Sequence, residues 1–279
     1  MERNKVWFIT GCSTGFGREL SKLVLELGYK AIVTARNPKD IQDITENYPD
    51  TSIPIQLDVT NKLEIENSIL KAKARFGRID ILVNNAGIGY FGAIEESEEE
   101  EVRRMFEINF FGLANVTNAV LPIMRAQRNG MIINIASIGG LVSFPAVGFY
   151  NATKFAVDGY SEVLAKETSH LGIKVMIVAP SGFRTDWAGR SANNTKKKIL
   201  DYEESAGANM QNIRASSGNQ AGDPVRAVKA IVKAVESENP PMRLLLGKAA
   251  LRNARNKLDS LKKEFDEWEE TTVSADYPQ

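Results

Sequence analysis

A tyrosine and a lysine stand four residues apart at Tyr150 and Lys154, and Ser137 precedes them, after an apolar stretch and before a glycine-rich loop. If a helix covers both positions, the two side chains share one face, so a phenol and an ammonium group enter the same site. A nearby cation favours the phenolate and is expected to lower the pKa of Tyr150 from its usual value of about 10. Such a phenol can serve as general acid and general base. The same spacing also occurs on solvated helix faces, so the rest of the chain must decide between the two interpretations.

A glycine-rich segment, Thr10-Gly11-Cys12-Ser13-Thr14-Gly15-Phe16-Gly17, follows the first apolar stretch. A strand, a glycine-rich turn and a helix in this order bind pyrophosphate, because glycines let the backbone approach and the N–H groups at the helix start attract negative charge. The spacing differs from G-x-G-x-x-G, since three residues separate the first two glycines.

The residues after the second apolar stretch bear on the choice of dinucleotide. An acidic side chain about 20 residues beyond the glycine loop would bond the ribose 2′-OH of NAD. This chain has Thr34-Ala35-Arg36-Asn37 there, and a guanidinium can pair with a 2′-phosphate. We therefore expect NADP(H), with NAD(H) the less favoured cofactor; an ordinary exposed arginine is the alternative interpretation of Arg36.

Short β-branched stretches that alternate with amphipathic ones predict the elements that position these residues. We expect strands over 6–10, 31–34, 53–57, 79–83, 131–135, 174–179 and 243–246. We expect helices over 18–27, 62–76, 98–124, 150–171 and 224–237. Nearly continuous apolar strands separated by helices are typical of a parallel sheet covered on both faces, so the fold class is α/β, a doubly wound parallel sheet of the Rossmann type with three α/β/α layers.

The remaining patterns concern domain organisation. No repeat or low-complexity block divides the chain, so residues 1–279 are expected to form a single domain. Residues 181–222 are rich in Ser, Asn, Gly and Ala and predict either a substrate lid or a solvated loop. The acidic run 95–101 is interpreted as a capping box from Ser97 to Glu100. A helix is expected over 249–268, with an apolar stripe for core packing or a subunit contact made of Leu251, Leu258, Leu261, Phe265 and Trp268.

Composition excludes several classes of protein. The chain has 279 residues, of which 43% are hydrophobic, enough for a full core. Lys plus Arg equals Asp plus Glu at 35 each, so no global basic field indicates nucleic acid or an anionic membrane as a partner. Cys12 is the only cysteine, which excludes an internal disulfide framework and a cysteine-based metal site and agrees with a reducing compartment. With no apolar stretch of 18 residues and no secretory signal pattern, a cytoplasmic location and no transmembrane segment are expected.

Five motifs together resemble the short-chain dehydrogenase/reductase family, and the match spans most of the chain. They are the T-G-x-x-x-G-x-G loop, Asn84-Asn85-Ala86-Gly87, Asn109, Ser137 and Tyr150-x-x-x-Lys154. The resemblance implies that Tyr150 is the acid/base and that Ser137 holds and polarises the substrate oxygen. It implies that Lys154 lowers the pKa of Tyr150 and bonds the nicotinamide ribose. Asn109 is expected to complete a proton relay through water, and no metal is required.

The resemblance also implies a set of cofactor-binding residues. In the family, the residue at Asp58 bonds the adenine, although Asp58 and Asn84 could instead cap strand ends. Ser181 replaces the glycine that usually follows the proline after the sixth strand, while Thr185 keeps the position that contacts the carboxamide. The expected set is Gly11, Ser13, Thr14, Gly15, Phe16, Gly17, Arg36, Asp58, Val59, Asn85, Ala86, Gly87, Tyr150, Lys154 and Thr185.

These observations predict an oxidoreductase that transfers a hydride between NADP(H) and a carbonyl/secondary alcohol pair. An apolar pocket for a hydrophobic small molecule is expected from Tyr90, Phe91, Phe144, Val147, Phe149, Phe183 and Trp187. One alternative is a non-catalytic dinucleotide sensor or scaffold, which would be expected to have lost a catalytic residue. Another is an epimerase or dehydratase, whose relatives have a different glycine spacing. Like many family members, the chain is expected to form a homodimer or homotetramer.

Overall fold

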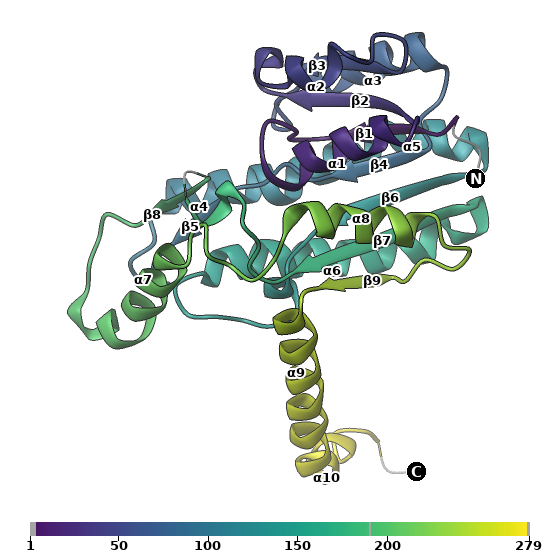
Figure 1. Cartoon of the computed structure of the whole chain (residues 1–279). Helices are drawn as coiled ribbons and strands as arrows, with labels where there is room; N and C mark the ends of the chain where they lie inside the picture. Colours follow the sequence, from purple (N-terminus) through teal and green to yellow (C-terminus); the bar gives the residue numbers. More distant parts are fainter. Residues whose placement is uncertain (1–3, 190, 278–279) are drawn as a thin grey trace.

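The computed structural model describes residues 4–189 and 191–277. These residues form a central parallel sheet with helices on its faces (Figure 1). The strand order is β3-β2-β1-β4-β6-β7-β9, and every neighbouring pair is parallel. The doubly wound α/β fold is therefore confirmed. The strands are β1 Val6–Ile9, β2 Lys30–Ala35, β3 Ser52–Gln56, β4 Ile81–Asn84, β6 Gly130–Ile135, β7 Ile173–Pro180 and β9 Arg243–Leu246.

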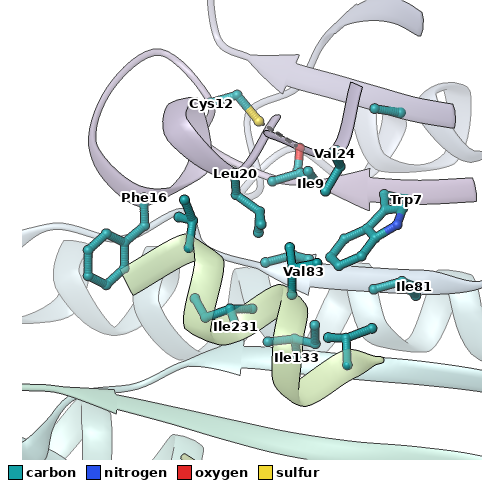
Figure 2. Close-up of a cluster of buried hydrophobic side chains, with 14 of the residues drawn as sticks. Trp7, Ile9, Cys12, Phe16, Leu20, Val24, Ile81, Val83, Ile133 and Ile231 are labelled. Carbon is teal, nitrogen blue, oxygen red and sulfur yellow. Dashed lines mark hydrogen bonds between the residues drawn. The ribbon is translucent and has the colours of Figure 1, made fainter. Parts of the chain in front are cut away.

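Helices cover both faces of the sheet because successive strand residues point to opposite sides. Trp7 and Ile9 of β1 belong to one buried cluster, whereas Val6 and Phe8 belong to the other. The first cluster is completed by α1 Gly15–Glu26 and α8 Pro224–Val235. The second is completed by α3 Lys62–Phe76, α5 Leu113–Gln127 and α6 Gly148–Thr168. Figure 2 shows the first cluster directly beneath the glycine loop.

The helix predicted over 98–124 is interrupted. It consists of α4 Glu99–Phe106, a π-helical turn Glu107–Gly112 and then α5. The predicted capping box is wrong, because the Ser97 hydroxyl donates to the Ala93 carbonyl oxygen and Glu98 precedes the helix without a side-chain cap. The π turn carries Asn109, and π turns within helices often mark functional positions.

The segment expected to be irregular contains regular structure. A short strand β8 Ala192–Asn194 pairs in parallel with β5 Gly89–Phe91, and α7 Ala208–Ala215 follows. These elements lie beyond the carboxyl ends of the central strands (Figure 1). Glu96 fixes the segment, since its buried carboxylate accepts hydrogen bonds from the Ala93 and Ile199 N–H groups at 3.0 and 2.8 Å.

The C-terminal helix α9 Lys248–Glu267 matches the predicted bounds to within one residue. Only its first turns pack on the body, through Ala250 and Ala254. The remainder projects away from the sheet and ends in α10 Glu269–Val273 (Figure 1). The remaining short helix, α2 Gln42–Thr45, follows β2.

Candidate active site

A cavity of about 990 Å³ lies at the carboxyl ends of the central strands, where α/β sheets bind ligands. The glycine loop after β1 lines one part of it, and Ser137 and α6 line another. The structure thereby brings residues more than a hundred positions apart to one wall. Of the predicted site residues, Gly17 and Asn109 lie behind the wall, and the others line it: Gly11, Ser13, Thr14, Gly15, Phe16, Arg36, Asp58, Val59, Asn85, Ala86, Gly87, Ser137, Tyr150, Lys154 and Thr185.

The loop requires glycine at some positions because of the backbone conformation, and at others because a side chain would clash with neighbouring atoms. Gly11 and Gly15 have φ values of 70° and 59°, in the left-handed region that favours glycine. A Cβ on Gly17 would stand 2.5 Å from the Gly11 carbonyl oxygen and from the Asn85 amide nitrogen. The first turn of α1 carries no acidic residue. The loop therefore presents a compact backbone and a helix N-terminus to the cavity, as binding of a phosphate group requires.

Asn85 ties the glycine loop to the end of β4. Its side-chain amide donates to the carbonyl oxygens of Thr10 and Gly11 at 2.9 Å each, and its backbone N–H donates to the Thr10 hydroxyl at 2.9 Å. The predicted Asn85-Ala86-Gly87 segment is thus fixed beside the loop. Thr10 is buried, and the backbone N–H and side-chain amide of Asn85 provide it with hydrogen-bond partners.

Tyr150 and Lys154 lie on one face of α6, as their spacing predicts, and both are buried. The Lys154 ammonium donates to the Ile135 carbonyl oxygen at 2.8 Å and lies 5.7 Å from the centre of the Tyr150 ring. The Tyr150 phenol hydrogen bonds with the Ser137 side chain. Phenol, hydroxyl and ammonium are therefore assembled around one end of the cavity.

The predicted direction of the Tyr150 pKa shift is wrong for this structure. Burial raises the pKa of Tyr150 to about 12, and the hydrogen bond with Ser137 offsets only part of that effect. Burial also lowers the pKa of Lys154 to about 8, because desolvation disfavours its charged form. The lysine charge is directed at a backbone carbonyl instead of at the phenol oxygen, so desolvation outweighs charge attraction.

Asn109 lies in the π-helical turn, just behind the cavity wall. Its side-chain oxygen accepts from the Ile88 N–H at 2.8 Å, and its amide group donates to the Ile88 carbonyl at 2.9 Å and to the Thr153 hydroxyl at 3.2 Å. These bonds join the π turn to α6 near Tyr150. The proton relay through water stays a prediction.

The far end of the cavity contains charged groups of both signs. Arg36 is exposed on its wall and, within 4–189 and 191–277, enters no ion pair given by the structure. Asp58 also lines the wall, while one of its carboxylate oxygens accepts from the Thr60 N–H and hydroxyl at 2.9 and 2.7 Å. Sequence reasoning missed Asp40, a second carboxylate on this wall. Its position three residues after Thr34-Ala35-Arg36-Asn37 gave no motif to recognise.

The segment after β7 closes the cavity over the glycine loop. Phe183 packs edge-on against Phe16 with ring centres 5.1 Å apart. Thr185 caps a short 3-10 turn that begins at Asp186, and its hydroxyl accepts from the Trp187 N–H at 3.4 Å. The Trp187 ring lies 4.9 Å from that of Tyr150. Aromatic contacts thus connect this segment both to the phosphate loop and to the phenol.

The apolar pocket is only partly where the sequence placed it. Four of the seven predicted side chains line the cavity: Phe144, Val147, Phe183 and Trp187. Tyr90, Phe91 and Phe149 instead belong to or pack on a buried cluster beside it. Sequence reasoning missed wall residues that distant segments contribute, since no local motif marks them: Ser191, Asn209, Ile213, Ala249 and Asn253.

A buried polar ladder beneath the site was also missed. The Asn84 amide donates to the Thr117 hydroxyl and to the Asn134 side-chain oxygen at 2.9 Å each, and the Asn134 amide donates to the Ser161 hydroxyl at 2.8 Å. The ladder joins β4 and β6 to α5 and α6. Asn84 therefore positions the helix of Tyr150 and does not face the cavity.

Two features are absent from the described parts of the chain. Within 4–189 and 191–277, His, Cys, Asp and Glu side chains form no group of three or more that could hold a metal ion. Over the same residues, no helix has the length and apolar character needed to cross a bilayer.

Comparison with known proteins agrees with this geometry. The family model described as short chain dehydrogenase matches residues 5–197. A 3-ketodihydrosphingosine reductase of Bacteroides thetaiotaomicron is 38% identical over 244 residues, covering 87% of this chain and 88% of that protein.

Solved structures show the same fold. The crystal structure of a short-chain dehydrogenase from Streptomyces avermitilis is 40% identical with a TM-score of 0.92 and covers 98% of this chain and 100% of its own. The structure of ElxO with NADP bound is 28% identical with a TM-score of 0.74, covering 89% of this chain and 99% of its own. The chain therefore belongs to the short-chain dehydrogenase/reductase family, and it is an NAD(P)-dependent oxidoreductase.

Proposed function

We propose that this protein reduces a hydrophobic carbonyl compound to a secondary alcohol with NADPH, or runs the reverse reaction, with Tyr150 as the acid/base. One observation supports this most directly: Tyr150, Ser137 and Lys154 meet at one part of a cavity whose other part is a glycine loop and an exposed arginine. A dinucleotide bound on that loop would share this cavity with the phenol.

The residues present fit a nicotinamide dinucleotide. The glycine loop would hold the pyrophosphate, and Arg36 would bind the 2′-phosphate. The segment Asn85-Ala86-Gly87 would lie along the cofactor. Lys154 and Thr185 would hold the ribose and the carboxamide. When bound, NADPH would supply the hydride. The NADP-bound ElxO structure supports this class of cofactor, and Arg36 supports the choice of NADP over NAD.

The raised pKa of Tyr150 determines which form of the phenol is available. With a pKa of about 12, the phenol is protonated at neutral pH and is ready to donate to an oxygen that gains negative charge during reduction. Ser137, which shares a hydrogen bond with this phenol, would stabilise the same oxygen. Lys154 would help to restore the proton of Tyr150, because its lowered pKa of about 8 makes its ammonium a better proton donor than an exposed lysine.

The substrate class follows from the wall around the phenol. Phe144, Val147 and Trp187 are apolar, and Ile213 of α7 completes this side. The name of the 38% identical relative, 3-ketodihydrosphingosine reductase, supports a ketone on a hydrophobic molecule. We propose that residues 181–222 act as the lid over this substrate within a single domain of 1–279, that the protein works in the cytoplasm, and that it assembles as a homodimer or homotetramer.

Replacing Tyr150 with Phe tests the proposal. The exchange removes the transferable proton but keeps the ring that packs on Trp187, so NADPH binding should persist while ketone reduction falls by a factor of about 10²–10⁴. NADPH oxidation with a panel of hydrophobic ketones and NADPH fluorescence titration measure the two properties. Tyr48→Phe, which does not line the cavity, is the matched control and should keep wild-type rates. Full activity in Tyr150→Phe would exclude the proposed acid/base.

A further inference from the structure

α7 lies beside β8 (Figure 1), and its Arg214 binds the segment that forms one wall of the cavity. The guanidinium donates to the carbonyl oxygens of Ala188 at 2.9 Å, Gly189 at 2.6 Å and Ala192 at 2.7 Å. Two of its nitrogens also donate to the side-chain oxygen of Asn194, one of them at 3.1 Å. A guanidinium carries its N–H donors in one rigid plane, and all three nitrogens of Arg214 are directed at this segment. A single side chain therefore joins the end of the 3-10 turn to β8 and α7.

The bonds from Arg214 satisfy backbone carbonyl groups that no strand reaches. The Ser191 carbonyl accepts from the Gly89 N–H of β5 at 3.1 Å, so the carbonyl of the next residue, Ala192, points away from β5. Ala188 and Ala192 are buried, and a buried carbonyl without a partner is costly. Over the residues that the structure describes, no carboxylate forms an ion pair with Arg214. Its donors therefore serve the backbone of this segment.

The elements that Arg214 joins contribute side chains to the cavity. Trp187 of the 3-10 turn, Asn193 of β8 and Ile213 of α7 all line its wall. Trp187 and Ile213 also pack on the buried cluster that contains Tyr150. Ile213 directly precedes Arg214, and Trp187 directly precedes one of the carbonyl groups that Arg214 binds. The guanidinium therefore sets where these two apolar side chains stand relative to each other.

A series of ring contacts also connects Arg214 with the phenol. The guanidinium carbon lies 4.7 Å from the centre of the Phe91 ring, a distance at which cation and ring attract each other. The Phe91 ring lies 5.3 Å from that of Trp187, and the Trp187 ring lies 4.9 Å from that of Tyr150. Trp187 is thus held both through its backbone and through its ring, and both contacts lead back to Arg214.

We propose that Arg214 is a positioning residue for the reaction, which fixes Trp187 and Ile213 on the wall of the substrate site. Arg214 itself does not line the cavity, so it acts through these two side chains. The proposal rests on the ketone reduction proposed above. It assigns to Arg214 the affinity for a bulky hydrophobic ketone. Cofactor binding should not depend on Arg214, because Asn85 holds the glycine loop through separate hydrogen bonds.

Steady-state kinetics of Arg214→Lys with NADPH and acetone, acetophenone or benzophenone test this role. An ammonium keeps the charge but lacks the planar set of donors, so several of the carbonyl groups lose their partner. The KM for benzophenone should rise about 10-fold, with a smaller rise for acetone, while kcat changes less than about 3-fold. NADPH titration should give the wild-type affinity. Arg226→Lys on α8, which is exposed and pairs with Asp223, is the matched control and should keep the wild-type KM.

These readouts separate positioning from a general loss of structure. Misfolding of part of the enzyme would lower kcat for every ketone in the same proportion and leave KM unchanged. Circular dichroism should show that Arg214→Lys is folded. If the wild type reduces no ketone of the series, the proposed function fails and the role of Arg214 fails with it. If the wild type reduces them and Arg214→Lys keeps its KM, or loses only kcat, the role of Arg214 alone is wrong.

Rescue of Arg214→Ala provides a second measurement of the same role. This variant lacks all the donors, so its KM for benzophenone should exceed that of Arg214→Lys. Millimolar guanidinium chloride supplies the missing group and should lower this KM toward the wild-type value, whereas sodium chloride at the same concentration should not. A KM that does not respond to guanidinium would contradict the assignment, because the loss would then not arise from the missing hydrogen bonds.

Discussion

At the residue scale, we expect the guanidinium of Arg36 to favour binding of NADPH over NADH. Arg36 is exposed on the cavity wall. We expect Arg36→Leu to weaken NADPH binding by a factor of about 10–100, the effect of one charge-assisted hydrogen bond to phosphate, and to leave NADH binding nearly unchanged. Fluorescence titration with both cofactors measures this. Lys39→Leu, an exposed neighbour, should change neither. Equal losses for the two cofactors would remove the role assigned to Arg36.

The buried ammonium of Lys154 makes stability depend on pH. Its pKa falls from 10.5 unfolded to about 8 in the folded chain, so between these values the unfolded state binds more protons and stability rises with pH. From pH 7 to 9 this group should add about 1 kcal/mol to the free energy of unfolding. Urea titrations of the wild type and Lys154→Met should show a rise that is smaller in the variant by this amount. An identical pH dependence would contradict the lowered pKa.

The sequence predicts individual site residues best where chemistry depends on spacing along one element. Tyr150 and Lys154 share a helix, and the glycines share one turn, so their juxtaposition needed no knowledge of the fold. The pKa of Tyr150 was predicted in the wrong direction, because burial and the hydrogen bond from Lys154 to the Ile135 carbonyl depend on packing. The Asn84–Asn134–Ser161 ladder likewise joins residues whose contact only the folded chain creates.

At the scale of elements, Asn61 fixes the start of α3. Its side chain accepts from the Leu63 and Glu64 N–H groups at 3.1 and 3.3 Å, which would otherwise lack partners in the helix. Asn61→Ala should lower the free energy of unfolding by about 1 kcal/mol. Chemical denaturation measures this free energy, with Asn67→Ala, at an exposed position inside the same helix, as the control variant. Equal stability of the two variants would show that water replaces the cap.

Element positions could be predicted where the hydrophobic period was strong, as in the seven central strands. The long helix before β6 was predicted as one element, since a π turn preserves helical direction and leaves little trace in the pattern. Ser97 matched a capping box, yet its hydroxyl bonds back to Ala93 and the helix starts later. Pairing of β5 with β8 joins segments about a hundred residues apart, which no local pattern encodes.

At the scale of the whole molecule, Glu96 holds the proposed lid to the body. Its carboxylate accepts two N–H groups, from Ala93 and Ile199, while the Thr195 hydroxyl donates to its backbone carbonyl. In Glu96→Gln the amide nitrogen must face one of those donors, at a cost of about 1–2 kcal/mol. Trypsin cleavage after residues 196–198, followed by mass spectrometry, should accelerate about 5- to 30-fold. Glu100→Gln, exposed on α4, is the control, and unchanged cleavage in Glu96→Gln would show that other contacts hold the segment.

Chemical labelling of the Cys12 thiol can report how often the phosphate loop opens. The thiol is fully buried within the loop, donates to the Ile9 carbonyl oxygen at 3.2 Å, and has a pKa raised to about 11 by burial (Figure 2). A protonated thiol out of contact with solvent does not react with a disulfide reagent until the loop opens. Since no other cysteine competes, the rate of thiol labelling measures how often the loop opens. A dinucleotide that binds the closed loop should slow labelling in proportion to its saturation.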